Sequence, residues 1–182
     1  MREVLPAAAD PLIRAMGEEG DLAVLRLARG CRCFAASAAE EVIAYGWLTS
    51  GPEWIGEVRF EIRPEPGQAY VWNCLTLPSH RRQGLFRAVL LGISSALQAD
   101  GVSRLWIASG GGAEKVLPDA GFHPVLRLSE SLLGLAGLRL VRATGVPGCE
   151  GDLVSAARRV LGGGGRPLGP RTLSRRPAAR RH

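Results

Sequence analysis

The amino-acid sequence predicts a single domain of the mixed α/β class (α+β mixed), in which helices flank a central mixed sheet that contains a parallel pair of strands. Three observations support this class. The chain is 46% hydrophobic, which suffices for one core, and its 182 residues are too few for two ordinary domains. Strand-like segments come first and then alternate with helical ones. After the central strand, the spacing at which apolar residues recur also changes from two residues, typical of a strand, to about 3.6 residues, typical of a helix.

The first half of the chain is expected to hold one short helix and a series of strands. The helix covers Ala7–Met16, and Gly17–Gly20 ends it. Apolar and charged side chains alternate strictly along Trp54–Ile62, which is typical of a half-exposed strand. An apolar run rich in β-branched and aromatic residues marks Ala69–Leu77 as a strand in the middle of the sheet. The other predicted strands are Ala23–Leu27, Cys31–Ala36 and Val42–Thr49.

Helical and extended segments alternate in the second half. Apolar residues recur at helical spacing over Leu85–Ala99, where Asp100-Gly101 ends the helix. A short strand at Arg104–Ser109 and a helix at Ala113–Leu117 follow, and Pro118 must truncate or kink that helix. The remaining predicted elements are extended stretches at His123–Leu128 and within Leu135–Ala143, and a helix from Asp152 to Leu161.

The positive charge of the protein is concentrated at one end of the chain. The net charge is +6, and Leu161–His182 contains six arginines and no acid, so the remainder is neutral. Glycines and prolines in the same segment oppose folding. We expect a folded domain over residues 1–148, an appended helix over 149–161 and a disordered Arg-rich tail over 162–182. The tail is either a solvated appendage or the one part of the chain that contacts nucleic acid or another acidic partner.

Composition argues for a cytoplasmic protein without a metal site. The longest apolar stretch, Leu132–Val141, is far shorter than the roughly 20 residues of a membrane helix. The first residues lack the pattern of a secretory signal. The four cysteines and three histidines show none of the paired spacings of a zinc site, so we expect buried free thiols, no metal and no membrane contact.

The junction between the central strand and the following helix carries the clearest chemical signal. The strand ends at Pro78, and a short loop turns at Gly84 directly into the helix. The first turn of a helix has unpaired N–H groups and partial positive charge. Arg81, Arg82 and Arg87 surround the same point, which suits a pyrophosphate. The alternative is an ordinary strand–helix turn with solvated arginines.

At these residues the sequence resembles the GNAT superfamily of N-acetyltransferases, whose coenzyme-A motif is approximately Pro-x-x-Arg/Gln-x-x-Gly-x-Gly/Ala. Pro78, Arg81 and Gly84 match this motif, whereas Phe86 departs from its small last residue. Gly121-Phe122 matches a second block at the expected distance. The resemblance covers about residues 40–124 and implies a GNAT fold, with a parallel strand pair that splays apart and with residues 1–148 as the acyltransferase domain.

The resemblance implies an acetyl-CoA-dependent N-acetyltransferase that transfers the acetyl group to a primary amine by direct attack. Acetyl-CoA is then the cosubstrate, and its arm enters between the central strand and the next one. The central strand offers its backbone to the pantetheine arm and the thioester, and backbone amides of the loop hold the pyrophosphate. The implied cofactor-binding residues are Cys74, Leu75, Thr76, Arg81, Arg82, Gln83, Gly84, Leu85 and Phe86.

Two departures from the family pattern leave a second function open. Gly110 stands where the family often has Asn, and Leu117 stands where it often has a tyrosine that acts as an acid. Leucine cannot donate a proton. The competing hypothesis is therefore a catalytically inactive acyl-CoA-binding or interaction module with the same fold. Exposed strands and the extra helix permit a homodimer without requiring one.

Several residues are candidates for proton transfer, and each also has a purely structural explanation. Glu57 and Glu61 share the polar face of a strand expected beside the central one, and Tyr70 and His80 are close to the site in sequence. Ser109 is the nearest hydroxyl for the acid. No acidic run marks a groove for a polycationic acceptor. The aromatic residues that either line an acceptor pocket or pack in the core are Tyr45, Trp47, Trp54 and Trp72.

Overall fold

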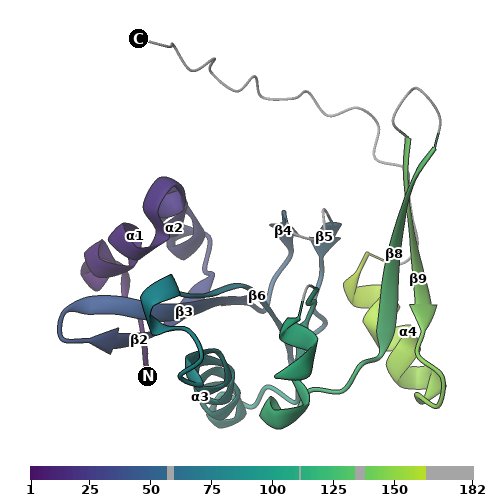
Figure 1. Ribbon diagram of the computed structural model, residues 1–182. Helices are drawn as coiled ribbons and strands as arrows, with labels where there is room; N and C mark the ends of the chain where they lie inside the picture. Colours follow the sequence, from purple (N-terminus) through teal and green to yellow (C-terminus); the bar gives the residue numbers. More distant parts are fainter. Residues whose placement is uncertain (57–59, 111, 134–137, 163–182) are drawn as a thin grey trace.

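The computed structural model describes residues 1–56, 60–110, 112–133 and 138–162, and a five-stranded sheet forms its centre (Figure 1). The strand order is β1-β2-β3-β6-β7, and every neighbouring pair is antiparallel except β6 and β7, which are parallel. The predicted mixed α/β class is therefore confirmed. The five strands are β1 (Arg2–Glu3), β2 (Arg32–Ala38), β3 (Glu41–Thr49), β6 (Gln68–Thr76) and β7 (Arg104–Ile107).

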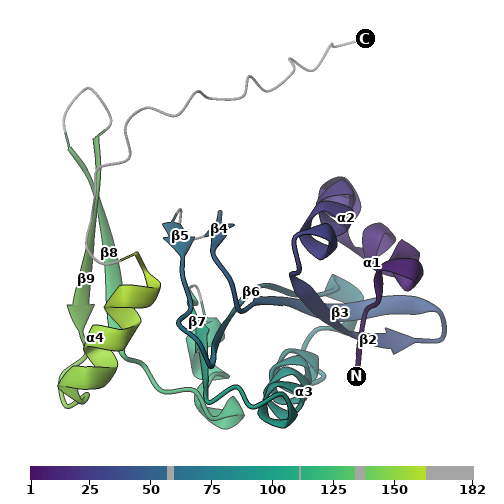
Figure 2. The same cartoon turned by 180° about the vertical axis from the view of Figure 1, so that it is seen from behind.

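Helices cover both faces of this sheet. The helices α1 (Asp10–Met16) and α2 (Gly20–Ala28) lie on one face, and α3 (Leu85–Ala99) lies on the other (Figures 1 and 2). The core on the α1–α2 side is built around the fully buried Trp47, and the core on the α3 side contains Leu48 with four buried apolar residues of α3. Each face of the sheet thus has its own apolar layer, as expected for a sheet with two covered faces.

Two further hairpins and one helix stand beside the central sheet. They are β4 (Glu53–Ile55) with β5 (Phe60–Ile62), β8 (Leu126–Leu133) with β9 (Leu138–Gly145), and α4 (Gly151–Val160). The end of α4 contacts the segment after β5: the Val160 carbonyl accepts a hydrogen bond from the Arg63 N–H at 2.7 Å, and Arg159 binds Glu65 at 2.7 Å. The chain also forms 3-10 helices at Pro6–Ala8, Gly17–Glu19, Pro78–His80, Ala113–Lys115 and Pro118–Ala120.

The predicted strand at Ala23–Leu27 is wrong, because this segment lies inside helix α2. Five residues are too few to separate a period of two from one of 3.6. The segment consists largely of Ala, Leu and Arg, which favour helices. Ala23 is fully buried in the core on this face, whereas Leu25 is 54% exposed.

The predicted continuous strand at Trp54–Ile62 is also wrong in part. Glu53 pairs with Ile62 and Ile55 pairs with Phe60, so the segment folds back on itself as a hairpin. Glycine at position 56 weakens a strand interior and permits this reversal. Ile62 is buried as the alternation predicts, but Ile55, which the alternation would place on the opposite face, is buried as well because the chain reverses between them.

The predicted helices at Leu85–Ala99 and at the end of the domain agree with α3 and α4, and Pro118 does divide its region into two short turns. No helix among the described residues has the length and apolarity needed to cross a membrane. The Arg-rich tail beyond Gly162 lies outside the described residues.

Gly46 of β3 allows α3 to approach the sheet, and this contact can be tested. A Cβ atom at Gly46 would lie 2.9 Å from both Cys74 Sγ and Val89 Cγ1. We expect Gly46→Ala to lower the free energy of unfolding by roughly 1–3 kcal/mol, as overpacked cores do. Gly51→Ala is the matched control, because nothing lies within 4 Å of its Cβ position. Chemical denaturation measures both, and equal stability of the two variants would contradict the close packing.

Candidate functional site

The parallel strands β6 and β7 separate halfway along β6. Their pairing runs from Gln68 with Arg104 to Val71 with Ile107, where β7 ends while β6 continues to Thr76. The other edge of β6 stays paired with β3 along this extension. The backbone of β6 from residue 72 to residue 76 therefore faces a gap where β7 would otherwise continue.

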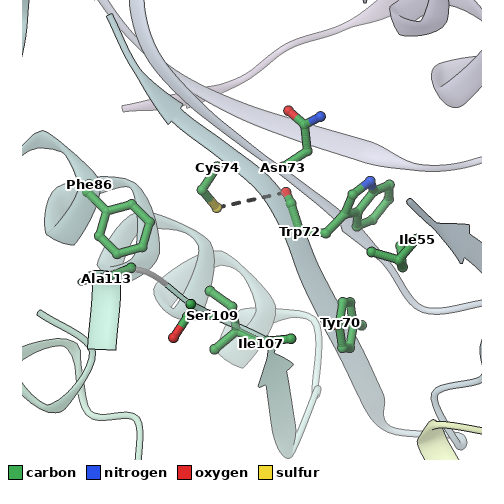
Figure 3. A pocket seen from close by; sticks show the side chains of 11 residues that line it. Ile55, Tyr70, Trp72, Asn73, Cys74, Phe86, Ile107, Ser109 and Ala113 are labelled. Carbon is green, nitrogen blue, oxygen red and sulfur yellow. Dashed lines mark hydrogen bonds between the residues drawn. The ribbon is translucent and has the colours of Figure 1, made fainter. Parts of the chain in front are cut away.

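Asn73 distorts β6 at this gap. Its φ is 44°, a left-handed conformation that few residues other than glycine adopt. The register between β3 and β6 shifts at the same place, as in a β-bulge. Bulges bend a strand and redirect its side chains, and they are common beside active sites. In Figure 3 the side chain of Asn73 points away from Phe86 and Ser109.

A pocket of about 420 Å³ occupies the gap (Figure 3). Tyr70, Trp72 and Ile55 line it and belong to the core on the α1–α2 side of the sheet. Phe86 and Ile107 line it as well, but they pack against the core on the α3 side. Since its walls come from both cores, the pocket is a passage through the sheet between the separated strands. We call it the sheet passage.

A second pocket, of about 590 Å³, lies at the start of α3, and we call it the anion pocket. Gly84 caps the helix with φ 74°, and Arg82 before it has φ 62°. The backbone N–H groups of residues 84–87 donate to no acceptor within the described part of the chain, whereas the N–H of Ala88 donates to the Gly84 carbonyl. The partial positive charge of these amides and of the helix dipole suits an anion.

Three arginines line the anion pocket, and no acid is among its described lining residues. Arg87 Nε donates to the Asp119 carbonyl at 2.9 Å, which ties the start of α3 to the short helix at Pro118–Ala120. Arg81 Nε donates to the Thr76 carbonyl at 3.4 Å. Arg82 forms no hydrogen bond or ion pair with the described residues, so its guanidinium can bind a ligand phosphate.

The two pockets form one groove, because Cys74, Phe86 and Ala113 line both. The hydroxyl oxygen of Thr76 is buried beside this groove without a hydrogen-bond partner among the described residues. An extended ligand with an anionic end fits this arrangement. Its anion would lie at the start of α3 and its arm would follow the open edge of β6 to the sheet passage.

Comparison with known proteins agrees with this architecture. The model of the acetyltransferase (GNAT) family matches residues 9–122, which is more than half of the chain. The chain belongs to the GNAT acetyltransferase family. A search of curated proteins found no match. The β8–β9 hairpin and α4 lie beyond the matched residues.

Solved GNAT structures share the fold at low sequence identity. A putative acetyltransferase from Agrobacterium tumefaciens is 17% identical, with 67% of this chain and 91% of that chain covered and a TM-score of 0.51. The enzyme AAC(6')-Iy in complex with a CoA bisubstrate analogue is 14% identical, with 67% and 88% covered and a TM-score of 0.51. Glucosamine-6-phosphate N-acetyltransferase from Arabidopsis thaliana is 9% identical, with 67% and 89% covered and a TM-score of 0.50.

The structure separates the residues expected to transfer protons in this GNAT protein. Tyr70 and Ser109 both line the sheet passage. Glu61 lies elsewhere, in β5, where its exposed carboxylate binds Arg63 Nη2 at 2.8 Å. His80 is half-buried, and its Nδ1 shares a 2.9 Å hydrogen bond with the Ser79 hydroxyl. Glu57 lies outside the described residues.

The aromatic residues divide in the same way. Trp72 lines the sheet passage, and Trp47 packs behind it in the core with ring centroids 6.4 Å apart. Trp54 is 47% exposed and lies in β4. Tyr45 is buried; burial raises the pKa of its phenol to about 12, and the negative charge of Glu19 adds to this shift. Tyr45 therefore stays protonated at neutral pH.

The two departures from the family motif have different surroundings. Gly110 lines the sheet passage but brings no side chain to it. Leu117 packs against the core on the α3 side. Neither residue supplies an acid. Sequence analysis missed Glu19, whose carboxylate accepts a 3.2 Å hydrogen bond from Asn73 across 54 residues of chain. No local pattern could have connected the two.

The four cysteines are free thiols. The Cys31 thiol donates to Glu53 Oε2 at 3.2 Å, and burial together with this bond raises its pKa to about 12. Burial also raises the pKa of Cys33. Cys74 and Cys149 are half-buried. Among the described residues, no three His, Cys, Asp or Glu side chains gather as a metal site.

Thiol labelling can test which residues border the groove. We expect maleimide to label Cys74 in the native protein at neutral pH, and free CoA to slow this labelling roughly tenfold or more at saturation. Cys149 is the internal control, because it lies outside the described lining of both pockets. Cys31 should stay unlabelled, since its raised pKa leaves almost no thiolate. Mass spectrometry measures each rate, and labelling of Cys74 that CoA does not slow would contradict the groove.

Proposed function

We propose that this GNAT protein is an N-acetyltransferase that uses acetyl-CoA to acetylate a primary amine. One observation carries the proposal: the anion pocket opens through Cys74 and Phe86 into a passage between two separated parallel strands. This groove offers an anion site at one end and a narrow exit through the sheet at the other. We further propose that residues 1–148 form the acyltransferase domain and that residues 149–161 form an appended helix.

The anion pocket would hold the pyrophosphate of CoA. The unpaired amides of residues 84–87 donate hydrogen bonds to it, and the exposed Arg82 adds a positive charge. The left-handed conformations at Arg82 and Gly84 turn the loop so that successive amides can face one ligand, as in an anion-binding nest. The full set proposed to contact CoA is Cys74, Leu75, Thr76, Arg81, Arg82, Gln83, Gly84, Leu85 and Phe86.

The open edge of β6 would hold the pantetheine arm. An extended amide chain can pair with a free strand edge as an additional strand does. The arm then replaces β7 beyond Val71, and its thioester reaches the sheet passage near Asn73 and Cys74. A backbone N–H of β6 can stabilise the negative charge that develops on the thioester oxygen.

The amine would approach from the opposite face of the sheet. Tyr70, Trp72 and Ile55 form that side of the passage, next to α1 and α2. The amine must lose a proton before or during attack, and the CoA thiolate gains one afterwards. Tyr70 and Ser109 are the hydroxyls in the described lining, and we propose that Ser109 assists at the thiolate end.

Two similar solved structures support an amine as the acceptor. AAC(6')-Iy was solved with a CoA–acetylneamine bisubstrate analogue, and the protein from Arabidopsis thaliana is a glucosamine-6-phosphate N-acetyltransferase. Both transfer to amino groups. The second candidate, an inactive acyl-CoA-binding module, is favoured by Gly110 and Leu117, which leave those two positions without an acid. Binding of CoA without its release, tested with a broad amine panel, would identify that module.

Substitution at Gly84 tests the CoA site. We expect Gly84→Glu to abolish stabilisation by free CoA, because the added carboxylate repels the pyrophosphate. Gly84→Asn is the matched control, since Asn tolerates a left-handed backbone and brings no charge. Saturating CoA should raise the Tm of the wild type and of Gly84→Asn by several degrees, at about 2–4 °C for each kcal/mol by which bound CoA stabilises the folded protein. An equal rise in Gly84→Glu would refute CoA binding at this loop.

Substitution at Ser109 tests proton transfer. We expect Ser109→Ala to lower kcat for acetyl transfer by about tenfold to hundredfold, while the Kd for CoA stays unchanged. Ser103→Ala is the control, because its hydroxyl bonds to the Gly67 carbonyl at the far end of β7. Steady-state release of CoA thiol gives kcat, and calorimetry gives Kd. Full activity of Ser109→Ala would remove Ser109 from the mechanism.

A further inference from the structure

A carboxylate stands on the acceptor side of the sheet passage. Glu19 ends the 3-10 helix Gly17–Glu19, which joins α1 to α2. Its Oε2 accepts a hydrogen bond of 3.2 Å from Asn73 Nδ2, and Asn73 lines the passage. Asn73 is the distorted residue of β6, so the bulge that redirects this strand also presents an amide to Glu19.

The carboxylate of Glu19 keeps most of its capacity to accept hydrogen bonds. An ionised carboxylate offers about four acceptor positions, and Asn73 uses one. Arg26 Nη2 lies 3.9 Å from Oε2, which is too long for a hydrogen bond. The Arg26 guanidinium instead lies over the Trp47 ring at 5.2 Å. The Glu19 side chain is 56% exposed, so a ligand can reach it.

Two other acids, Glu53 and Glu61, are already bound to arginine. Glu53 receives two hydrogen bonds from Arg29, at 3.1 and 2.9 Å. Glu61 is bonded to Arg63. The carboxylate of Glu19 differs from both because its hydrogen-bond donor is a neutral amide. The Arg26 guanidinium, 3.9 Å away, offsets part of its negative charge without a hydrogen bond, so acceptor positions on the carboxylate remain for an ammonium group.

The apolar surroundings favour an amine with an organic body over a bare ion. Trp72 and Ile55 line the passage on the side from which the amine would enter, and Trp47 supports Trp72 from behind. An aromatic or aliphatic body can pack on these side chains while its ammonium group reaches the Glu19 carboxylate beside the lining residue Asn73.

We propose that Glu19 binds the ammonium group of the acceptor, so that the enzyme selects amines that arrive as cations. The inference rests on the proposed function, because it assigns a specificity residue to the acceptor side of that site. Glu19 forms an ion pair with the ammonium, and Asn73 holds the carboxylate in place for it. Asn73 is thus a positioning residue.

Titration with benzylamine and aniline tests this role. The two amines have similar bodies, but benzylamine is a cation at neutral pH and aniline is neutral. The full chain, labelled with ¹⁵N and saturated with free CoA, is titrated while the Asn73 side-chain amide is followed by NMR. We expect Glu19→Gln to weaken benzylamine binding by roughly fivefold to tenfold and to leave aniline binding unchanged. Glu19→Asp, which keeps the charge, should retain part of the affinity.

Glu18→Gln is the matched control, because Glu18 lies in the same 3-10 helix, is exposed and contacts none of the described residues through a hydrogen bond or ion pair. It should bind benzylamine as the wild type does. Wild-type affinity of Glu19→Gln for benzylamine, or no response of Asn73 in the wild type, would overturn the inference. The titration is repeated without CoA, so that amine binding is also measured independently of the nucleotide. Failure of CoA to bind would then count against the proposed function alone.

Discussion

The structure depends on the separation of two parallel strands. β3 pairs with β6 from Tyr70 to Thr76, with one shift of register, but β7 follows β6 only as far as the pair Val71–Ile107. The remaining backbone of β6 is therefore rigidly supported on one edge and open on the other. Such an edge is a cost in most proteins because it can pair with other chains. Here it lies at the wall of a pocket, where pairing with an extended ligand can satisfy it.

The same strand also positions the anion site. β6 leads through the 3-10 helix Pro78–His80 and a short loop into α3, whose buried Val89, Leu90 and Ile93 fix the helix against the sheet. Gly46 of β3 lets the helix approach closely. The start of α3 cannot move without disturbing this core, so its unpaired amides are preorganised for an anion. Preorganisation lowers the ordering cost of binding, which is how an exposed loop can hold a charged ligand.

Sequence reasoning predicted the parts of this site that depend on local pattern. The change of period at Leu85, the glycine at the cap and the surrounding arginines all lie within one short segment. It failed in two places: the five residues Ala23–Leu27 are too few to show the period of the helix that contains them, and Glu61 turns away because the strand folds back at Gly56. The bond between Glu19 and Asn73 joins two distant segments, so no spacing rule could reveal it.

The central claim is that the amides at the start of α3 bind the pyrophosphate of CoA and direct its arm along β6. A crystal structure with bound CoA tests this most directly. The account predicts phosphate oxygens within hydrogen-bonding distance of the backbone N–H groups of residues 84–87, and pantetheine amides paired with β6 beyond Val71. A nucleotide bound elsewhere, or held only by arginine side chains with these amides facing solvent, would contradict it.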